Sequence, residues 1–167
     1  IVDVNLPAMT ECPELIKQIE TIVVLDHHRQ NNDTIKKAVV SYVEPYASSS
    51  CEMVAEILQY IPDKPKLRPI EADALYSGIL VDTDNFVVKA GVRTFEAAAY
   101  LRRAGADVTR VRKMFREDME NCKIRADIIN RAELFYDEFA ISTFDGRNVD
   151  GATVIGAKAA NALLDVQ

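Results

Sequence analysis

Short runs rich in β-branched residues predict three strands in the first part of the chain, at residues 1–4, 21–25 and 38–43. The run TIVVL at 21–25 is almost entirely apolar, which is typical of a parallel strand covered on both faces. It ends abruptly at the polar segment Asp26-His27-His28-Arg29. We therefore expect a mainly parallel sheet, with polar side chains directly after its second strand.

Apolar residues with helical spacing predict helices between and after these strands. A short helix is expected around Pro13 with Thr10 as its N-cap, and a longer one from about Cys51 to Tyr60 with Ser49 as its N-cap. Three more helices are expected: one from Pro69, one capped by Thr94, and one from Asp107 or Thr109 that continues to about Phe135.

The pattern changes again after residue 135. Residues 138–144 predict a strand, Asp145-Gly146 predicts a hairpin turn, and residues 149–154 predict the partner strand. A helix over residues 155–164 follows. This order predicts the fold class α/β, with a mainly parallel sheet flanked by helices, followed by the start of an α+β domain.

The composition excludes several classes of protein. The 167 residues carry a net charge of −6, which argues against a general nucleic-acid or anionic-membrane binder, so no stable nucleic-acid complex is expected. Cys12, Cys51 and Cys122 lie far apart and form no CxxC motif, so neither a disulfide framework nor a structural zinc site is predicted. No GxGxxG follows a predicted strand, which argues against a dinucleotide-binding oxidoreductase.

Carboxylates and both histidines of the chain lie where predicted elements end. Asp26, His27 and His28 directly follow the second strand, at the edge where open α/β sheets bind ligands. Asp3 ends the preceding strand, and Asp82 lies at the end of an apolar helical run. Imidazole and carboxylate donors together suit Mn²⁺ or a similar divalent ion. A purely structural interpretation stays open, because such residues also form ordinary polar loops and turns.

The motifs around these residues resemble those of the DHH phosphoesterase family. Leu25–Arg29 resembles the family's defining motif, Val2–Asn5 its preceding aspartate motif, and Gly78–Thr83 the aspartate motif that follows. The segments 44–52 and 91–97 resemble the membrane-anchored bacterial cyclic-di-AMP phosphodiesterases of this family. The resemblance runs to about residue 135. It implies a DHH domain over residues 1–135 and the beginning of a DHH-associated C-terminal domain over residues 136–167.

The resemblance also implies a set of metal ligands. Asp3 would bridge two Mn²⁺ ions, and His27 and Asp82 would complete the shell of the second ion. Such paired ions activate a water molecule for phosphodiester hydrolysis.

Three further residues are implied in catalysis. Asp26 would orient His27 through a ring nitrogen, as carboxylates next to metal ligands commonly do. His28 and Arg29 would face the phosphate and stabilise its negative charge. The implied reaction is the hydrolysis of cyclic-di-AMP to the linear dinucleotide.

Two motifs of the family are not found in this sequence. The His-x-Asp-x-Asp type cluster expected before Asp3 supplies most ligands of the first ion, and the glycine-rich substrate motif would lie beyond Gln167. We therefore expect the complete protein to hydrolyse its substrate. The 167 residues alone are expected to be inactive or nearly so, and to bind metal weakly.

Other functions stay open at this point. Within the family the alternatives are a nanoRNA or pAp phosphatase, acting on a short oligonucleotide, and an inorganic pyrophosphatase. Outside catalysis, the alternative is a nucleotide-binding sensor module that has lost its activity. An unpaired sheet edge favours association, so a homodimer is a further hypothesis. The resemblance implies a location at the cytoplasmic face, with the longer protein anchored in the bacterial membrane.

Overall fold

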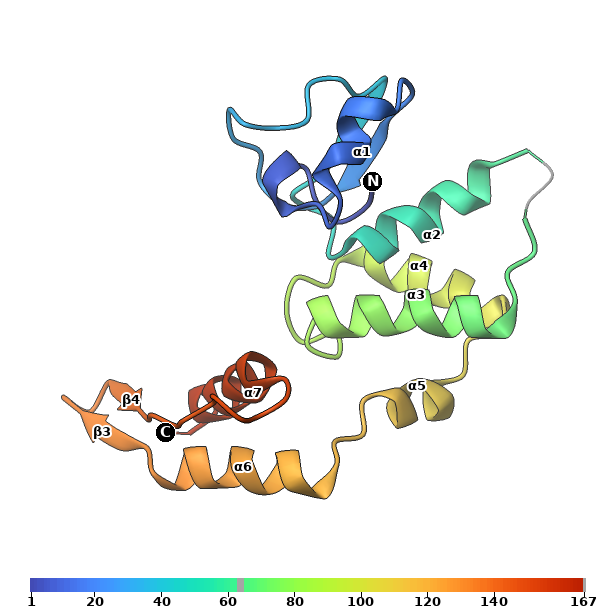
Figure 1. Ribbon diagram of the computed structural model, residues 1–167. Coiled ribbons are helices and arrows are strands. Elements are labelled where there is room, and N and C mark those ends of the chain that lie inside the picture. Colours follow the sequence, from blue (N-terminus) through green and yellow to red (C-terminus); the bar gives the residue numbers. More distant parts are fainter. Residues whose placement is uncertain (63–64, 167) are drawn as a thin grey trace. The chain divides into compact units, whose positions relative to one another are not determined.

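A computed structural model describes residues 1–62 and 65–166, and the last residue of the predicted second domain lies outside them. The chain forms two compact units, residues 1–114 and residues 115–167, which are described separately (Figure 1). This division falls before the predicted domain boundary at residue 135, because helix α6 (Met119–Asn130) packs against α7 (Ala152–Leu164). The boundary at residue 135 itself stays a prediction.

The first unit contains a small parallel sheet. Strand β1 (Val23–Asp26) pairs in parallel with β2 (Val40–Val43), and Val2 forms a single parallel bridge to Leu25 on the other side of β1. The Leu25 N–H donates a hydrogen bond to the Ile1 carbonyl at 3.0 Å, and the Leu25 carbonyl accepts one from the Asp3 N–H at 2.9 Å. Because the paired segments are parallel, their carboxyl ends lie at one edge. The predicted class, a parallel sheet flanked by helices, is confirmed.

The sheet is less buried than the apolar run at residues 21–25 predicts. Burial alternates along β1: Val24 is buried, whereas Val23 is 41% exposed. Ile22 and Val24 pack with Ile35 in a small cluster on one face. The prediction of two covered faces was wrong for the residues that the structure describes, because Val23 on the second face stays exposed and Leu25 is only half-buried.

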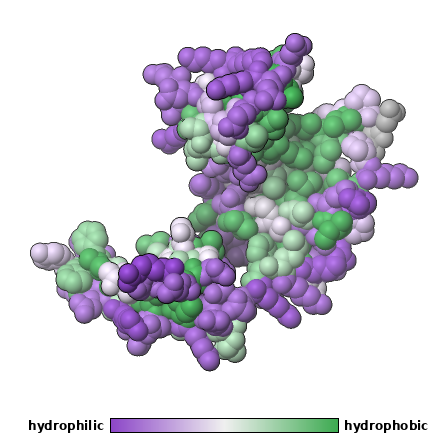
Figure 2. Space-filling model, viewed as in Figure 1, coloured by the Kyte–Doolittle hydropathy of each residue, from purple (hydrophilic) through white to green (hydrophobic). Residues whose placement is uncertain are grey.

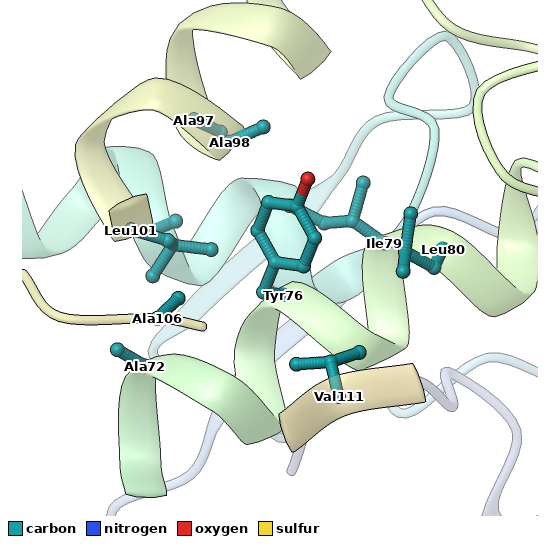
Figure 3. Close-up of a cluster of buried hydrophobic side chains, with 10 residues drawn as sticks. Ala72, Tyr76, Ile79, Leu80, Ala97, Ala98, Leu101, Ala106 and Val111 are labelled. Carbon is teal, nitrogen blue, oxygen red and sulfur yellow. The ribbon is translucent and has the colours of Figure 1, made fainter. Parts of the chain in front are cut away.

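Four helices form the main core of the first unit. They are α2 (Ser50–Tyr60), α3 (Pro69–Asp82), α4 (Val92–Arg103) and α5 (Val108–Met114). Figure 3 shows Tyr76 of α3 between Leu101 of α4 and Val111 of α5. Several apolar side chains of α2 are only half-buried, and Figure 2 shows a hydrophobic surface over this helix. Beside the sheet lie the short 3-10 helix η1 (Pro7–Met9) and α1 (Pro13–Gln18).

The helix starts differ in part from the predicted ones. Ser49 caps α2 as predicted, and its hydroxyl accepts a hydrogen bond from the Glu52 N–H at 3.0 Å. The predicted caps Thr10 and Thr94 were wrong. Thr10 donates to the Pro7 carbonyl instead, and α4 begins two residues before Thr94, whose hydroxyl accepts the Gly91 N–H.

The second unit departs most from the sequence-based expectation. The single helix predicted to reach Phe135 is broken after Met114, and α6 begins anew with Asp118 as its N-cap. Strand β3 (Glu133–Phe135) pairs antiparallel with β4 (Phe139–Ile141). The predicted hairpin at Asp145-Gly146 was wrong: the turn lies at Tyr136 and Asp137, which have φ values of 56° and 55°. Pairing between apolar strands therefore outweighed the turn signal.

No helix in the residues described by the structure has both the length and the apolar composition needed to cross a bilayer.

An ion pair between the buried Asp73 and the half-exposed Arg110 holds α5 against α3. The carboxylate of Asp73 is 1% exposed, and it accepts hydrogen bonds from the Arg110 guanidinium at 2.6 and 3.2 Å and from the Asp107 N–H at 2.7 Å. The Arg110 guanidinium and the Asp107 N–H lower the pKa of Asp73. The ionised carboxylate therefore stabilises the folded first unit.

We expect Asp73→Asn to lower the midpoint of thermal unfolding at pH 7, because the variant keeps an acceptor but loses the charge that pairs with Arg110. The pKa of Asp73 is lower in the folded state than the ordinary 3.8. The ionised Asp73 therefore contributes to the stability of the fold above pH 3.8, and this contribution is lost as the pH falls through the pKa of the folded state. The difference between wild type and variant should shrink below about pH 4. Thermal unfolding followed by circular dichroism at several pH values measures it.

Asp145→Asn is the matched control, because Asp145 pairs with Arg147 on the exposed surface. It should leave the unfolding of the first unit unchanged. A difference between Asp73→Asn and wild type that persists undiminished at low pH would contradict this account.

Candidate metal centre

The segment Asp26–Arg29 leaves the sheet at the carboxyl edge of β1. Asp26 is the last residue of β1, and the histidines follow it in the connection toward β2. Asp3 reaches the same edge through its backbone bond to Leu25. Its φ of 68° turns the chain away from the sheet at this point. The parallel pairing therefore brings two separate polar segments to one place.

The structure brings His27, Asp3 and Asp82 together. His27 Nε2 lies 3.4 Å from Asp3 Oδ1 and 3.7 Å from Asp82 Oδ2. The imidazole is 9% exposed, whereas the side chains of Asp3 and Asp82 are 59% and 35% exposed. Asp82 is supplied by the last residue of α3, far along the sequence. The carboxylates of Asp3 and Asp82 thus both approach the same imidazole nitrogen beside open solvent.

The side chains at this edge form a donor set that fits a divalent cation. Ligand atoms of Asp3, His27 and His28 lie within 4.8 Å of one another, and Asp82 adjoins this group at His27. Two neighbouring ligands at about 2.1 Å from one small ion lie about 3–4 Å apart. The distances from His27 to both carboxylates fall in this range. Oxygen and imidazole nitrogen donors suit ions such as Mn²⁺.

The surroundings of Asp82 disfavour an isolated negative charge and so favour a nearby cation. Burial raises the pKa of Asp82, and the nearby Asp3 carboxylate raises it further, whereas His27, His28 and Lys89 act in the opposite direction. Two close carboxylates repel each other when both are ionised, and a cation between them relieves this repulsion.

Asp26 does not take the predicted role. The sequence analysis assigned it to His27, but the fully buried Asp26 carboxylate faces His28 instead, with 2.7 Å between Oδ1 and Nδ1. Oδ1 also accepts the His28 backbone N–H at 3.2 Å. A carboxylate only accepts, so Nδ1 carries the hydrogen and Nε2 points away from Asp26. The prediction failed because these contacts turn the two neighbouring imidazoles toward different partners.

Arg29 lies apart from the cluster. It is exposed, and within residues 1–62 and 65–166 it forms no hydrogen bond or ion pair. His28 is also exposed, at 59%, but its ring stands 4.4 Å from the His27 ring between centroids. The structure therefore brings His28, but not Arg29, into contact with the predicted metal ligands.

Asn5 is a residue to which the sequence analysis gave no role. Its side chain is 4% exposed and donates to Asp26 Oδ2 at 2.6 Å and to the His28 carbonyl at 3.4 Å. It supplies the donor that a buried carboxylate requires. The available signal was its place in the segment Val2–Asn5, which resembles the aspartate motif of the family.

The first turn of α2 lies beside the same carboxylates. Burial, together with Asp82 and Asp3, raises the pKa of the Cys51 thiol to about 11. The thiol is therefore uncharged at neutral pH and packs as a small apolar group. Next to it, the buried Glu52 carboxylate accepts hydrogen bonds from the Ser48 hydroxyl at 2.5 Å and from the Ser48 N–H at 3.3 Å.

Comparison with known proteins identifies the family. Residues 1–79 match the model of the DHH family, N-terminal domain, which includes Asp3, Asp26, His27 and His28. The chain belongs to the DHH family.

Three curated relatives are similar in sequence. The cyclic-di-AMP phosphodiesterase PdeA of Listeria monocytogenes is 40% identical over 167 residues, and GdpP of Bacillus subtilis, also a cyclic-di-AMP phosphodiesterase, is 41% identical over 167 residues. The bifunctional oligoribonuclease and PAP phosphatase NrnA of Mycoplasma pneumoniae is 29% identical over 114 residues, or 66% of this chain and 34% of NrnA. The chain spans 25% of the length of PdeA and of GdpP, which match 100% and 99% of it.

A solved structure shares the fold. The exopolyphosphatase-related protein of Bacteroides fragilis superposes with a TM-score of 0.81 at 16% sequence identity, over 99% of this chain and 50% of that protein. At this identity the likeness concerns the fold alone.

We expect Asn5→Ala to destabilise the protein by about 1–3 kcal/mol, because it leaves a buried oxygen of Asp26 without its donor. The contact between Asp26 and His28 should loosen as well. Chemical denaturation measures the first effect, and the imidazole ¹⁵N shifts of His28 report the second. Asn32→Ala, at an exposed position of the connection between β1 and β2, is the control and should change neither. Unchanged stability and unchanged His28 shifts in Asn5→Ala would show that Asn5 does not support Asp26.

Proposed function

We propose that this chain forms part of a metal-dependent phosphodiesterase that hydrolyses cyclic-di-AMP to the linear dinucleotide. The observation that carries the proposal is the meeting of Asp3, His27 and Asp82 at the carboxyl edge of the parallel sheet. The names of the relatives PdeA and GdpP support the substrate, since both match almost the whole chain at about 40% identity.

In this proposal three residues hold the metal. Asp3, the most exposed of them, would bridge two Mn²⁺ ions, while His27 and Asp82 would bind one of the pair. When bound, such ions activate water and neutralise charge on the phosphate. Mn²⁺ is proposed from the mixed donor set, which matches its preference for imidazole and carboxylate.

His28 would act on the substrate rather than on the metal. Asp26 holds its Nδ1, so Nε2 is directed away from the buried carboxylate. In its protonated form the ring would donate from Nε2 to a phosphate oxygen, where negative charge develops. The exposed Arg29 would add a permanent positive charge for a phosphate approaching from solvent. Asp26 thus acts through His28, by orienting it.

A second candidate function is the hydrolysis of short oligonucleotides or pAp. NrnA, a relative with that named activity, supports it, but the identity is lower and the match covers less of the chain. The alternative of an inactive sensor module is disfavoured because Asp3, His27 and Asp82 are all retained in one cluster. A homodimer, and a location at the cytoplasmic face of a membrane that anchors the longer protein, stay predictions.

We expect Asp82→Asn in the complete protein to lower the Mn²⁺-dependent hydrolysis of cyclic-di-AMP by about 100-fold or more, because a metal ligand is lost. Asp84→Asn is the matched control, since Asp84 is an exposed carboxylate two residues away. Product formation followed by chromatography at fixed Mn²⁺ measures both. Equal losses in the two variants, or none in either, would contradict the role of Asp82. Faster hydrolysis of pAp or a short oligonucleotide than of cyclic-di-AMP would favour the second candidate.

The 167 residues by themselves are expected to show no Mn²⁺-dependent turnover of cyclic-di-AMP. The ligands proposed in this chain are one imidazole and two carboxylates, which are fewer donors than a two-ion site requires. The same assay, run side by side on this chain and on the complete protein, tests the expectation. Detectable Mn²⁺-dependent turnover by the short chain would contradict it.

A further inference from the structure

Helices α2 and α3 approach each other closely at one point, between Cys51 and Gly78. A Cβ atom added to Gly78 would overlap the Cys51 Sγ and lie 3.2 Å from the Cys51 Cβ. Carbon atoms in favourable contact lie about 3.5–4.0 Å apart. Rotation of the thiol alone would therefore not make room for a methyl group. A methyl group at residue 78 therefore requires a shift of the helices at this point in addition to rotation of the thiol.

The backbone conformation of residue 78 does not explain why this residue is a glycine. Gly78 lies within α3, where any residue can adopt the conformation. Glycine destabilises a helix interior by roughly 0.5–1 kcal/mol relative to alanine. Packing against Cys51 is the feature of the position that an alanine could not reproduce. Here the tertiary contact outweighs the helix propensity.

This contact lies one helical turn before Asp82. Residues four apart occupy the same face of a helix, so Gly78 and Asp82 face the same side of α3. The carboxylates of Asp82 and Asp3 both help to raise the pKa of the Cys51 thiol, so both lie near it. A displacement of α3 at Gly78 would therefore move the Asp82 carboxylate relative to His27 and Asp3, which the sheet holds.

We propose that Gly78 is a positioning residue for the metal centre: its lack of a side chain lets α3 pack on Cys51 and so sets the place of the Asp82 carboxylate opposite His27. This inference rests on the proposed function, because it assigns Asp82 to a metal ion. It predicts that a larger side chain at residue 78 or at residue 51 weakens metal binding, although no metal ligand is changed.

The test measures Mn²⁺ affinity by calorimetry in the complete protein, with circular dichroism to confirm folding. Gly78→Ala should weaken Mn²⁺ binding about tenfold or more, the loss typical of changes behind the ligands. Gly78→Ala combined with Cys51→Gly removes both the Sγ and the Cβ of residue 51 from the contact and should recover most of the affinity. Cys51→Val adds bulk from the α2 side and should reproduce the loss. Gly91→Ala is the control, since a Cβ there meets nothing within 4 Å.

Each outcome bears on the proposal. Folded Gly78→Ala with wild-type affinity would overturn it, as would failure of the folded double variant to recover. If Gly78→Ala does not fold, Cys51→Val decides, and unchanged affinity in that variant overturns the inference. A wild-type protein that binds no Mn²⁺ would instead overturn the proposed function itself.

Discussion

The candidate metal centre depends on the parallel pairing between the first residues of the chain and β1. Leu25 uses both its N–H and its C=O to bind residues 1 and 3, which sets the register of Asp3 beside the end of β1. A slip of one residue in a strand moves each side chain to the opposite face. Asp3 would then no longer face His27. Two backbone hydrogen bonds thus decide whether two distant polar segments form one site.

The same edge of the sheet also supplies the hydrogen-bond donors that a fully buried carboxylate needs. Asp26 is removed from water, and such a group is stable only when donors replace its hydration. Asn5 supplies one donor and His28 supplies two, through its ring and its backbone. The consequence is a division between the neighbouring histidines. His27 faces the carboxylates of Asp3 and Asp82, whereas His28 is held by Asp26.

The helical core of the first unit supplies the remaining ligand. Asp82 ends α3, whose apolar residues Tyr76, Ile79 and Leu80 pack in the core shared with α4 and α5. The ion pair between the buried Asp73 and Arg110 ties the other half of α3 to α5. The position of Asp82 is therefore a property of helix packing, and the close contact at Gly78 is part of it.

Much of this protein follows from its sequence alone. The polar residues after the apolar run at 21–25 marked the site, and local capping at Ser49 and helical spacing from Pro69 gave α2 and α3, because such signals act between residues near in the chain. Only the tertiary structure decided that Asp26 is buried between Asn5 and His28, that Val23 of β1 stays exposed, and that the hairpin turns at Tyr136. The first two outcomes depend on which donors and apolar surfaces arrive from distant segments, and the third depends on which of two possible strand pairings is more stable. The order of neighbouring residues alone does not encode either.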